Sequence, residues 1–98
     1  MPIIMVQEMP GVTQAQYEQV TDRVSGGKGG LGSRADYPVP GLISHAAGPT
    51  PDGWIVVDVW ESEEALQRFS EHLLPALREA GVPEDRPKIF SAFNVITD

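Results

Sequence analysis

Asp58 is the polar residue of this sequence that most strongly suggests chemistry. It lies in the segment VVDVW at residues 56–60, whose apolar residues predict a strand buried on both faces. A buried carboxylate is costly unless it is paired or protonated. Asp58 is therefore either a general base in a cavity or a carboxylate neutralised by an arginine or a dimer partner. A hairpin that pairs Gly48 with Trp54 would place Ser44 opposite this carboxylate, and a single bulge would reverse that assignment.

The two histidines are the other candidates for proton transfer. Neither has the local spacing of a metal-binding pair, so the sequence predicts no metal site. His45 lies among apolar residues in a predicted strand, where it is either a general acid/base or a hydrogen-bonded residue of a dimer interface. His72 flanks the apolar stripe of a predicted helix and is either a ligand contact or a partly exposed side chain.

Several aromatic residues are spaced so that they either line a pocket or form ordinary core. They are Tyr17, Trp60, Phe69 and one of Phe90 and Phe93. A pocket built from them would accept a small apolar or aromatic ligand.

The composition narrows the possible partners of these residues. The 98 residues suffice for one domain, residues 1–98. The absence of cysteine excludes disulfides, thiolate metal sites and thiol catalysis. Seven Lys and Arg against 14 Asp and Glu give a net charge of −7, which disfavours nucleic acid and anionic membrane surfaces. No apolar run is long enough to span a bilayer, and the first residues lack the features of a signal peptide, so we expect a cytoplasmic protein.

The order of predicted elements is β-α-β-β-α-β. Strands are expected at residues 3–6, 42–47, 54–60 and 88–96. Thr13 with Gln16 forms a capping box for the first helix, which Ser25 and the glycines after it end. Ser62 caps the second helix, Gly81 closes it, and Pro75 within it predicts a kink or a restart. The fold class is α+β: a ferredoxin-like four-stranded antiparallel sheet with two helices on one face.

A long loop rich in glycine and proline occupies residues 25–41. Its segment GKGGLG at residues 27–32 matches the spacing of the dinucleotide-binding fingerprint. A helix enters this loop and none leaves it, so we expect a chance match. The loop is either mobile or a lid over a cavity.

The predicted third strand presents apolar residues to both sides. Val56 and Trp60 lie on one side, and Ile55, Val57 and Val59 on the other. A sheet face open to water would carry polar residues, so the face without helices needs a partner. A second copy of the same sheet is the simplest partner, which predicts a homodimer.

The segment GWIVVDVWESEEAL at residues 53–66, with Pro40-Gly41-Leu42 before the hairpin, resembles the antibiotic biosynthesis monooxygenase-like superfamily. The resemblance extends over about residues 1–96 and implies a dimeric α+β barrel with a cavity between sheet and helices. This family includes cofactor-independent oxygenases that form quinones on aromatic polyketides, haem-degrading oxygenases and related cyclases.

The resemblance also assigns roles to single residues. Trp60 matches the tryptophan that lines the family's cavity, and Gln7 falls near an asparagine of the oxygenases. Val56 stands where the quinone-forming members have a second asparagine, which weakens the oxygenase interpretation. The iron-binding histidine of the haem-degrading members corresponds to Glu79 here, and His72 comes two turns too early, so we expect no haem and no other cofactor.

The resemblance and the residues together lead to three functional hypotheses. The first is a cofactor-independent monooxygenase for an aromatic, polyketide-like substrate, with Asp58 or His45 as base and Trp60 as a further catalytic candidate. The second is a non-oxidative cyclase or isomerase on the same substrate class, and the third a non-catalytic dimeric ligand-binding accessory protein. The candidate substrate-binding residues are Gln7, Tyr17, Phe69, His72 and Asn94.

Overall fold

The computed structural model describes residues 1–27, 29–83 and 86–97. Its strands are β1 (Ile3–Pro10), β2 (Leu42–Thr50), β3 (Gly53–Trp60) and β4 (Lys88–Ser91). Its helices are α1 (Gln14–Val24), a short 3₁₀ helix (Arg34–Asp36) and α2 (Glu63–Glu79). None of the described helices is long and apolar enough to cross a membrane.

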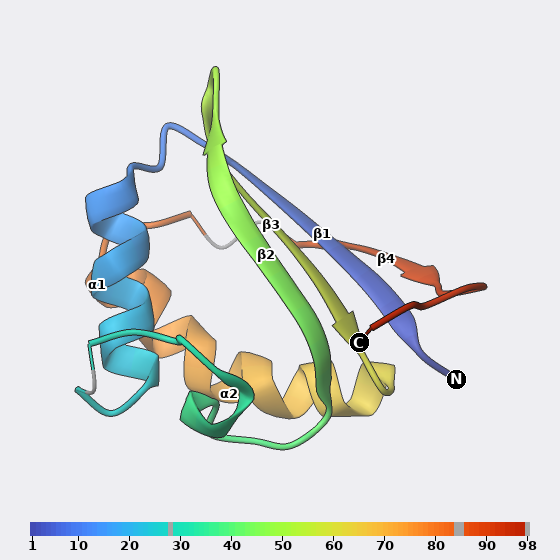
Figure 1. The fold of residues 1–98 in the computed structure, drawn as a ribbon. Helices are drawn as coiled ribbons and strands as arrows, with labels where there is room; N and C mark the ends of the chain where they lie inside the picture. Colours follow the sequence, from blue (N-terminus) through green and yellow to red (C-terminus); the bar gives the residue numbers. More distant parts are fainter. Residues whose placement is uncertain (28, 84–85, 98) are drawn as a thin grey trace.

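The four strands form one antiparallel sheet in the order β2-β3-β1-β4. Both long helices lie on the same face of this sheet, as Figure 1 shows, and none of the described helices lies on the opposite face. The structure therefore confirms the ferredoxin-like α+β fold that the sequence predicts.

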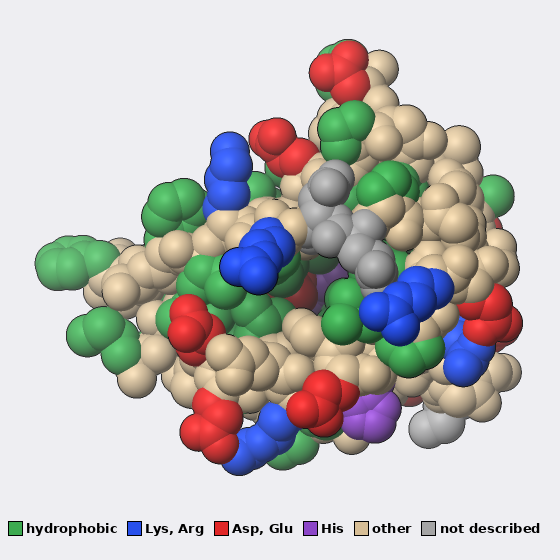
Figure 2. Space-filling view, turned by 180° about the vertical axis from the view of Figure 1, so that it is seen from behind, with side chains coloured by type: hydrophobic (Ala, Val, Ile, Leu, Met, Phe, Trp, Pro, Cys, Tyr) green, Lys and Arg blue, Asp and Glu red, His purple; other side chains and the backbone are tan. Residues whose placement is uncertain are grey.

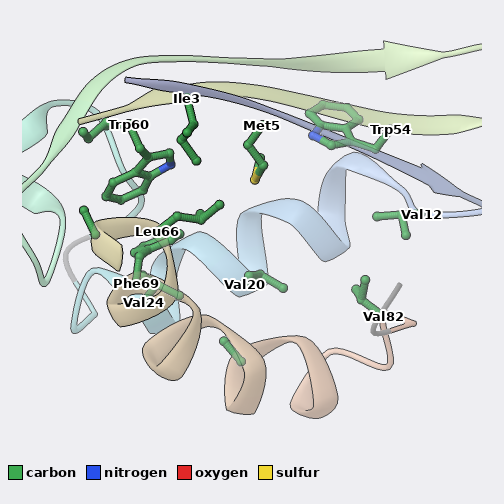
Figure 3. Close-up of a cluster of buried hydrophobic side chains, with 13 residues drawn as sticks. Ile3, Met5, Val12, Val20, Val24, Trp54, Trp60, Leu66, Phe69 and Val82 are labelled. Atoms are coloured by element: carbon green, nitrogen blue, oxygen red, sulfur yellow. The ribbon is translucent and has the colours of Figure 1, made fainter. Parts of the chain in front are cut away.

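The hydrophobic core fills the space between the sheet and the helices. Trp60 is fully buried, and Figure 3 shows that its side chain points from the sheet toward Phe69 and Leu66 of α2. The side chains of Met5 and Ile3 point from β1 into the same layer. The strands and helices thus bury one shared apolar layer, which provides most of the stability of a domain of this size.

The predicted helix caps are confirmed. The Thr13 side chain accepts from the backbone N–H of Gln16, whose own side chain accepts from the N–H of Thr13. The Ser62 hydroxyl likewise accepts from the N–H of Ala65 at 3.1 Å. Helix α2 runs as a single helix through Pro75, so the predicted restart does not occur.

The predicted fourth strand is too long, because the structure has β4 only at Lys88–Ser91. In the antiparallel register Ser91 pairs with Ile3, and the N–H of Ala92 donates to the carbonyl of Pro2 at 3.0 Å. Pairing therefore ends where β1 begins. Phe93 is fully exposed and lies in no strand.

The register of the β2–β3 hairpin differs by one residue from the predicted one. Pro49, rather than Gly48, pairs with Trp54. As a result His45, and not Ser44, lies opposite Asp58. A one-residue shift moves every side chain of a strand to the other face, so this register decides which polar group of β2 faces the helices.

A bulge between Leu42 and Ser44 then restores the pairing of Leu42 with Trp60. As a result, Leu42 lies beside Trp60 in the core, and His45 lies opposite Asp58. The bulge also separates the apolar end of β2 from its polar middle.

Candidate functional site

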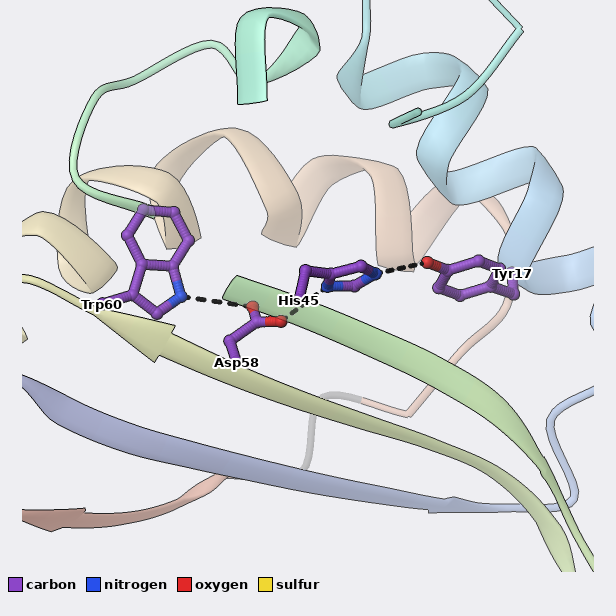
Figure 4. Close-up of polar contacts among 4 residues, drawn as sticks. All are labelled: Tyr17, His45, Asp58 and Trp60. Carbon is purple, nitrogen blue, oxygen red and sulfur yellow. Dashed lines mark hydrogen bonds and ion pairs between the residues drawn. The ribbon is translucent and has the colours of Figure 1, made fainter. Parts of the chain in front are cut away.

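The Asp58 carboxylate is buried on the helix-facing side of β3 and is only 3% exposed. Its Oδ1 lies 2.5 Å from Nδ1 of His45, and its Oδ2 accepts a hydrogen bond of 3.2 Å from Nε1 of Trp60 (Figure 4). Both carboxylate oxygens therefore have a partner within the chain. Within the chain, the partner of this carboxylate is a histidine and not the arginine considered from the sequence.

His45 connects this carboxylate to a phenol on α1. Its Nε2 lies 2.8 Å from the Tyr17 hydroxyl. We assign Nδ1–H as the donor to Asp58, since a carboxylate accepts, and Nε2 of the neutral ring as the acceptor of the Tyr17 O–H. Because both ring nitrogens are occupied in this way, His45 belongs to an internal hydrogen-bond chain and not to an interface on the open sheet face.

Tyr17 is held over the sheet by its own ring contacts. Its ring is nearly coplanar with that of His45, with centroids 6.4 Å apart and an interplanar angle of 9°, and it lies 5.1 Å from the ring of Trp54. Burial, and then the negative charge of Asp58, raise the pKa of Tyr17 above its ordinary value. The Tyr17 hydroxyl therefore keeps its proton at neutral pH.

This hydrogen-bond chain lies at one cavity of about 120 Å³ between the sheet and the helices. Its wall is mainly apolar, and the polar side chains of Gln7, Tyr17, His45 and Asp58 come to it from β1, α1, β2 and β3. Figure 2 shows hydrophobic side chains around a recess in which histidine and acidic atoms are visible. An apolar cavity with a few convergent polar groups is typical of a small-molecule site.

The loop between α1 and β2 supplies a further part of the wall, through Leu31 and Tyr37. The Asp36 carboxylate orders this loop by accepting from the backbone N–H groups of Gly32 and Ser33 at 3.0 and 3.1 Å. Of the two interpretations of the loop, its position over the cavity favours a cover. Lys28, the second residue of the glycine-rich motif, lies outside the described residues.

The predicted site residues fall into three groups. Gln7, Tyr17, His45, Asp58 and Phe69 all contribute to the cavity wall.

Trp60 is different, because it does not line the cavity. It is fully buried behind Asp58, and its indole N–H points to the carboxylate. The position implied for Trp60 by the family resemblance is therefore wrong for this chain, and the residue supports the site from behind, through its hydrogen bond to Asp58 and its ring contacts with Tyr37 and Phe69.

His72 and Asn94 lie outside the cavity. Both side chains are exposed, and neither contributes to the wall. His72 lies on the solvent side of α2, because only one stripe of this helix faces the core. Asn94 follows the end of β4, where pairing with β1 has stopped. Phe90 and Phe93, considered as pocket aromatics, are 54% and 103% exposed and also lie outside it.

Tyr37 is the cavity residue that the sequence did not reveal. It lies in a loop without periodicity, so neither strand nor helix spacing could assign it a face. The available signal was an aromatic residue between Asp36 and Pro38 in an otherwise polar and glycine-rich stretch.

Within residues 1–27, 29–83 and 86–97, no three histidine or acidic side chains are grouped so that they could hold a metal ion. Glu79, at the position of the iron-binding histidine in the haem-degrading members, forms an exposed ion pair with Arg23.

Comparison with known proteins reveals relatives by structure only. No protein-family model matches the sequence, and no curated protein matches it at significant similarity. Two crystal structures of SnoaB, a cofactor-independent oxygenase from Streptomyces nogalater, resemble the whole chain. One of them, an asparagine-to-alanine mutant of SnoaB, has a TM-score of 0.61 at 16% identity, and the match covers 99% of this chain and 97% of SnoaB. The second structure has a TM-score of 0.54 at 19% identity and coverages of 99% and 95%.

A likeness at this level of identity concerns the path of the backbone. It agrees with the β-α-β-β-α-β order, the antiparallel sheet and the resemblance carried by residues 53–66. The chain therefore shares its fold with SnoaB, in agreement with the α+β fold that its sequence predicts.

Proposed function

We propose that this protein is a cofactor-independent monooxygenase that oxidises an aromatic, polyketide-like substrate in the cavity between sheet and helices. The observation that carries the proposal is the hydrogen-bond chain of Tyr17, His45 and Asp58 at the wall of an apolar cavity. The structural likeness to a cofactor-independent oxygenase supports the same reaction class.

The chemistry requires a base and a dry pocket. Removing a proton from a phenol or an activated CH₂ group yields an electron-rich anion, which can react with O₂ without a cofactor. For a ring CH₂ the balance is CH₂ + O₂ → C=O + H₂O, so the substrate supplies all four electrons and one oxygen atom leaves as water. Exclusion of bulk water from the cavity protects the anion until oxygen reacts with it.

His45 is the proton acceptor in this proposal. Both oxygens of Asp58 are occupied by N–H groups, so the carboxylate holds the tautomer of His45 and stabilises the imidazolium that forms. The Tyr17 hydroxyl is bonded to Nε2 of His45 at the wall of the cavity. It passes its own proton to Nε2 as it receives one from the substrate.

The test is oxygen consumption with hydroxylated aromatic substrates. We expect the wild-type chain to consume O₂ and the His45→Gln variant to lose at least about 100-fold in rate, the usual share of a general base. Conversion of substrate without O₂ uptake would identify a cyclase or isomerase instead. Tight binding without any conversion would identify a ligand-binding accessory protein.

We further propose that the protein is a homodimer that pairs its open sheet faces. The sheet face without helices carries partly exposed apolar residues from neighbouring strands, and Phe90 of β4 on the same face is 54% exposed. They include Ile4, Val6, Ile55, Val57 and Val59. A contiguous apolar patch of this kind marks an interaction surface, and a self-complementary sheet closes it with two-fold symmetry. The cytoplasmic location expected from the sequence stays a prediction.

Sedimentation at micromolar concentration tests the dimer. Val57 lies in the middle of the open face, between Val6 and Ala46. Val57→Asp would place two like charges in the interface, and we expect it to produce monomers. Gln67→Glu adds the same charge on the exposed side of α2 and should leave the dimer intact. A monomeric wild-type chain would disprove the proposal.

A further inference from the structure

Tyr37 has a buried hydroxyl with no hydrogen-bond partner among the described residues. The Tyr37 side chain is held in this position by neighbouring aromatic rings. The ring lies 5.3 Å from Phe69 and packs edge-on against Trp60 and His45, each at 6.1 Å. A buried hydroxyl that finds no partner costs about 1–3 kcal/mol, so its retention in a tightly packed place calls for an explanation.

The polar groups of the site are bonded to one another and not to this hydroxyl. Asp58 already accepts from His45 and Trp60, and the second nitrogen of His45 is bonded to Tyr17. Tyr37 contributes to the cavity wall, and it lies within electrostatic reach of both Asp58 and Tyr17. Its hydroxyl is thus at the polar end of the cavity, beside the hydrogen-bond chain but not part of it.

The Tyr37 hydroxyl is a donor and stays one. Burial, then the charge of Asp58 and then Tyr17, raise its pKa well above the ordinary value, so the phenol remains protonated through the physiological range. A fixed, protonated phenol in an apolar cavity is suited to a ligand oxygen that carries or develops negative charge.

We propose that Tyr37 is a substrate-binding residue whose O–H donates to the oxygen of a phenolic ring, and that Tyr17 and His45 remove the proton from that same oxygen. This inference rests on the proposed function, because the substrate anion forms in the same cavity. Tyr37 would bind this oxyanion more strongly than the neutral phenol, and so favours the deprotonated substrate.

The size of the cavity sets the shape of the group that enters. A cavity of about 150 Å³ lined by apolar side chains holds one benzene molecule. The cavity here, of about 120 Å³, therefore has room for one aromatic ring of the substrate. The loop that carries Tyr37 forms part of the wall around this ring, through Leu31 and Tyr37.

Binding of two small fluorinated probes tests the role of Tyr37 independently of turnover. The probes are 4-fluorophenol and 4-fluorotoluene, which differ only in a hydroxyl against a methyl group, and ¹⁹F NMR reports the affinity of each. We expect Tyr37→Phe to weaken 4-fluorophenol about tenfold and to change the affinity of 4-fluorotoluene by less than about twofold. The second probe also shows that the variant cavity is intact.

Equal affinity of 4-fluorophenol for the wild-type chain and Tyr37→Phe would overturn the inference, as would a wild-type chain that binds neither probe. The oxygenase proposal has a separate measure. A tenfold loss of 4-fluorophenol binding without O₂ consumption by the wild-type chain would leave Tyr37 as a ligand-binding residue and remove the oxygenase reaction.

Discussion

Two walls of the same cavity carry a tyrosine each, and they differ in how the hydroxyl is bonded. On the wall built by α1, β2 and β3, the Tyr17 hydroxyl is bonded to His45, which is bonded to Asp58. On the wall supplied by the loop, the Tyr37 hydroxyl has no partner among the described residues. The hydroxyl of the first wall has its hydrogen-bond partner within the chain, and this bond keeps a path for a proton in one geometry. The hydroxyl of the second wall finds a partner only when a ligand supplies an oxygen.

The contrast has a structural cause. The regular elements set the positions of Tyr17, His45 and Asp58 through strand register and a capped helix, so their polar atoms meet at 2.5 and 2.8 Å. The loop is positioned by its own turn contacts and by the packing of one aromatic ring. Preorganised chemistry thus lies on rigid elements, and ligand recognition on the segment that covers them.

We expect the largest loss of activity from a change of Asp58, in the wall that carries Tyr17. Asp58→Asn keeps the size of the side chain, but its NH₂ group either faces the N–H of Trp60 or stands opposite Nδ1 of His45, which must then give up its proton and change the tautomer of the ring. We expect at least about a 100-fold loss in oxygen consumption. We also expect a melting temperature lower by at least about 4–8 °C, from the 1–3 kcal/mol cost of unmatched buried donors.

Glu71→Gln is the matched control, since it makes the same change of charge at an exposed position of α2. Wild-type activity and stability of Asp58→Asn would show that the hydrogen-bond chain of Tyr17, His45 and Asp58 supports neither the reaction nor the fold.

The loop wall is held at its end by Gly41, which has a φ of +112°. A Cβ at this position would meet the Cβ of Ala65 at 2.7 Å, in a backbone conformation that other residues rarely adopt. We expect Gly41→Ala to lower the melting temperature by about 10 °C. Gly48→Ala has open space and an ordinary φ, so thermal unfolding of this control should match the wild-type chain.

A pair of tyrosine variants compares the two walls directly. Tyr17→Phe leaves Nε2 of His45 without its partner, and we expect a melting temperature lower by about 4–8 °C, the effect of about 1 kcal/mol. Tyr37→Phe removes a hydroxyl that has no partner among the described residues and should leave the melting temperature equal or slightly higher. Equal destabilisation by the two variants in differential scanning calorimetry would contradict the difference between the walls.

The smallest effect concerns alkaline pH. A tyrosine of the unfolded chain has a pKa of about 10. Burial raises the pKa of Tyr17 and of Tyr37 in the folded chain. Above about pH 10 the unfolded state therefore binds fewer protons than the folded state, and stability falls as pH rises.

Urea unfolding at pH 8 and pH 10.5 measures this loss. We expect Tyr37→Phe to lose less stability between the two pH values than the wild-type chain, because one of the two buried phenols is absent. An identical loss in both proteins would show that Tyr37 does not contribute to the alkaline transition.

The sequence alone determined the element order, both helix caps and the apolar faces of β3. These features follow from local rules, since capping, periodicity and turns depend on residues close together in the chain. The same rules placed Asp58 on the face of Trp60, because successive side chains of a strand alternate between its two faces.

Only the tertiary structure decided which side chains meet at the site. One residue of strand register replaced Ser44 by His45 opposite Asp58, and the packing of α1 on the sheet brought Tyr17 to His45. The loop then delivered Tyr37 to the same cavity. These contacts join residues distant in sequence. They depend on strand register and packing, which the spacing of residues along the chain does not reveal.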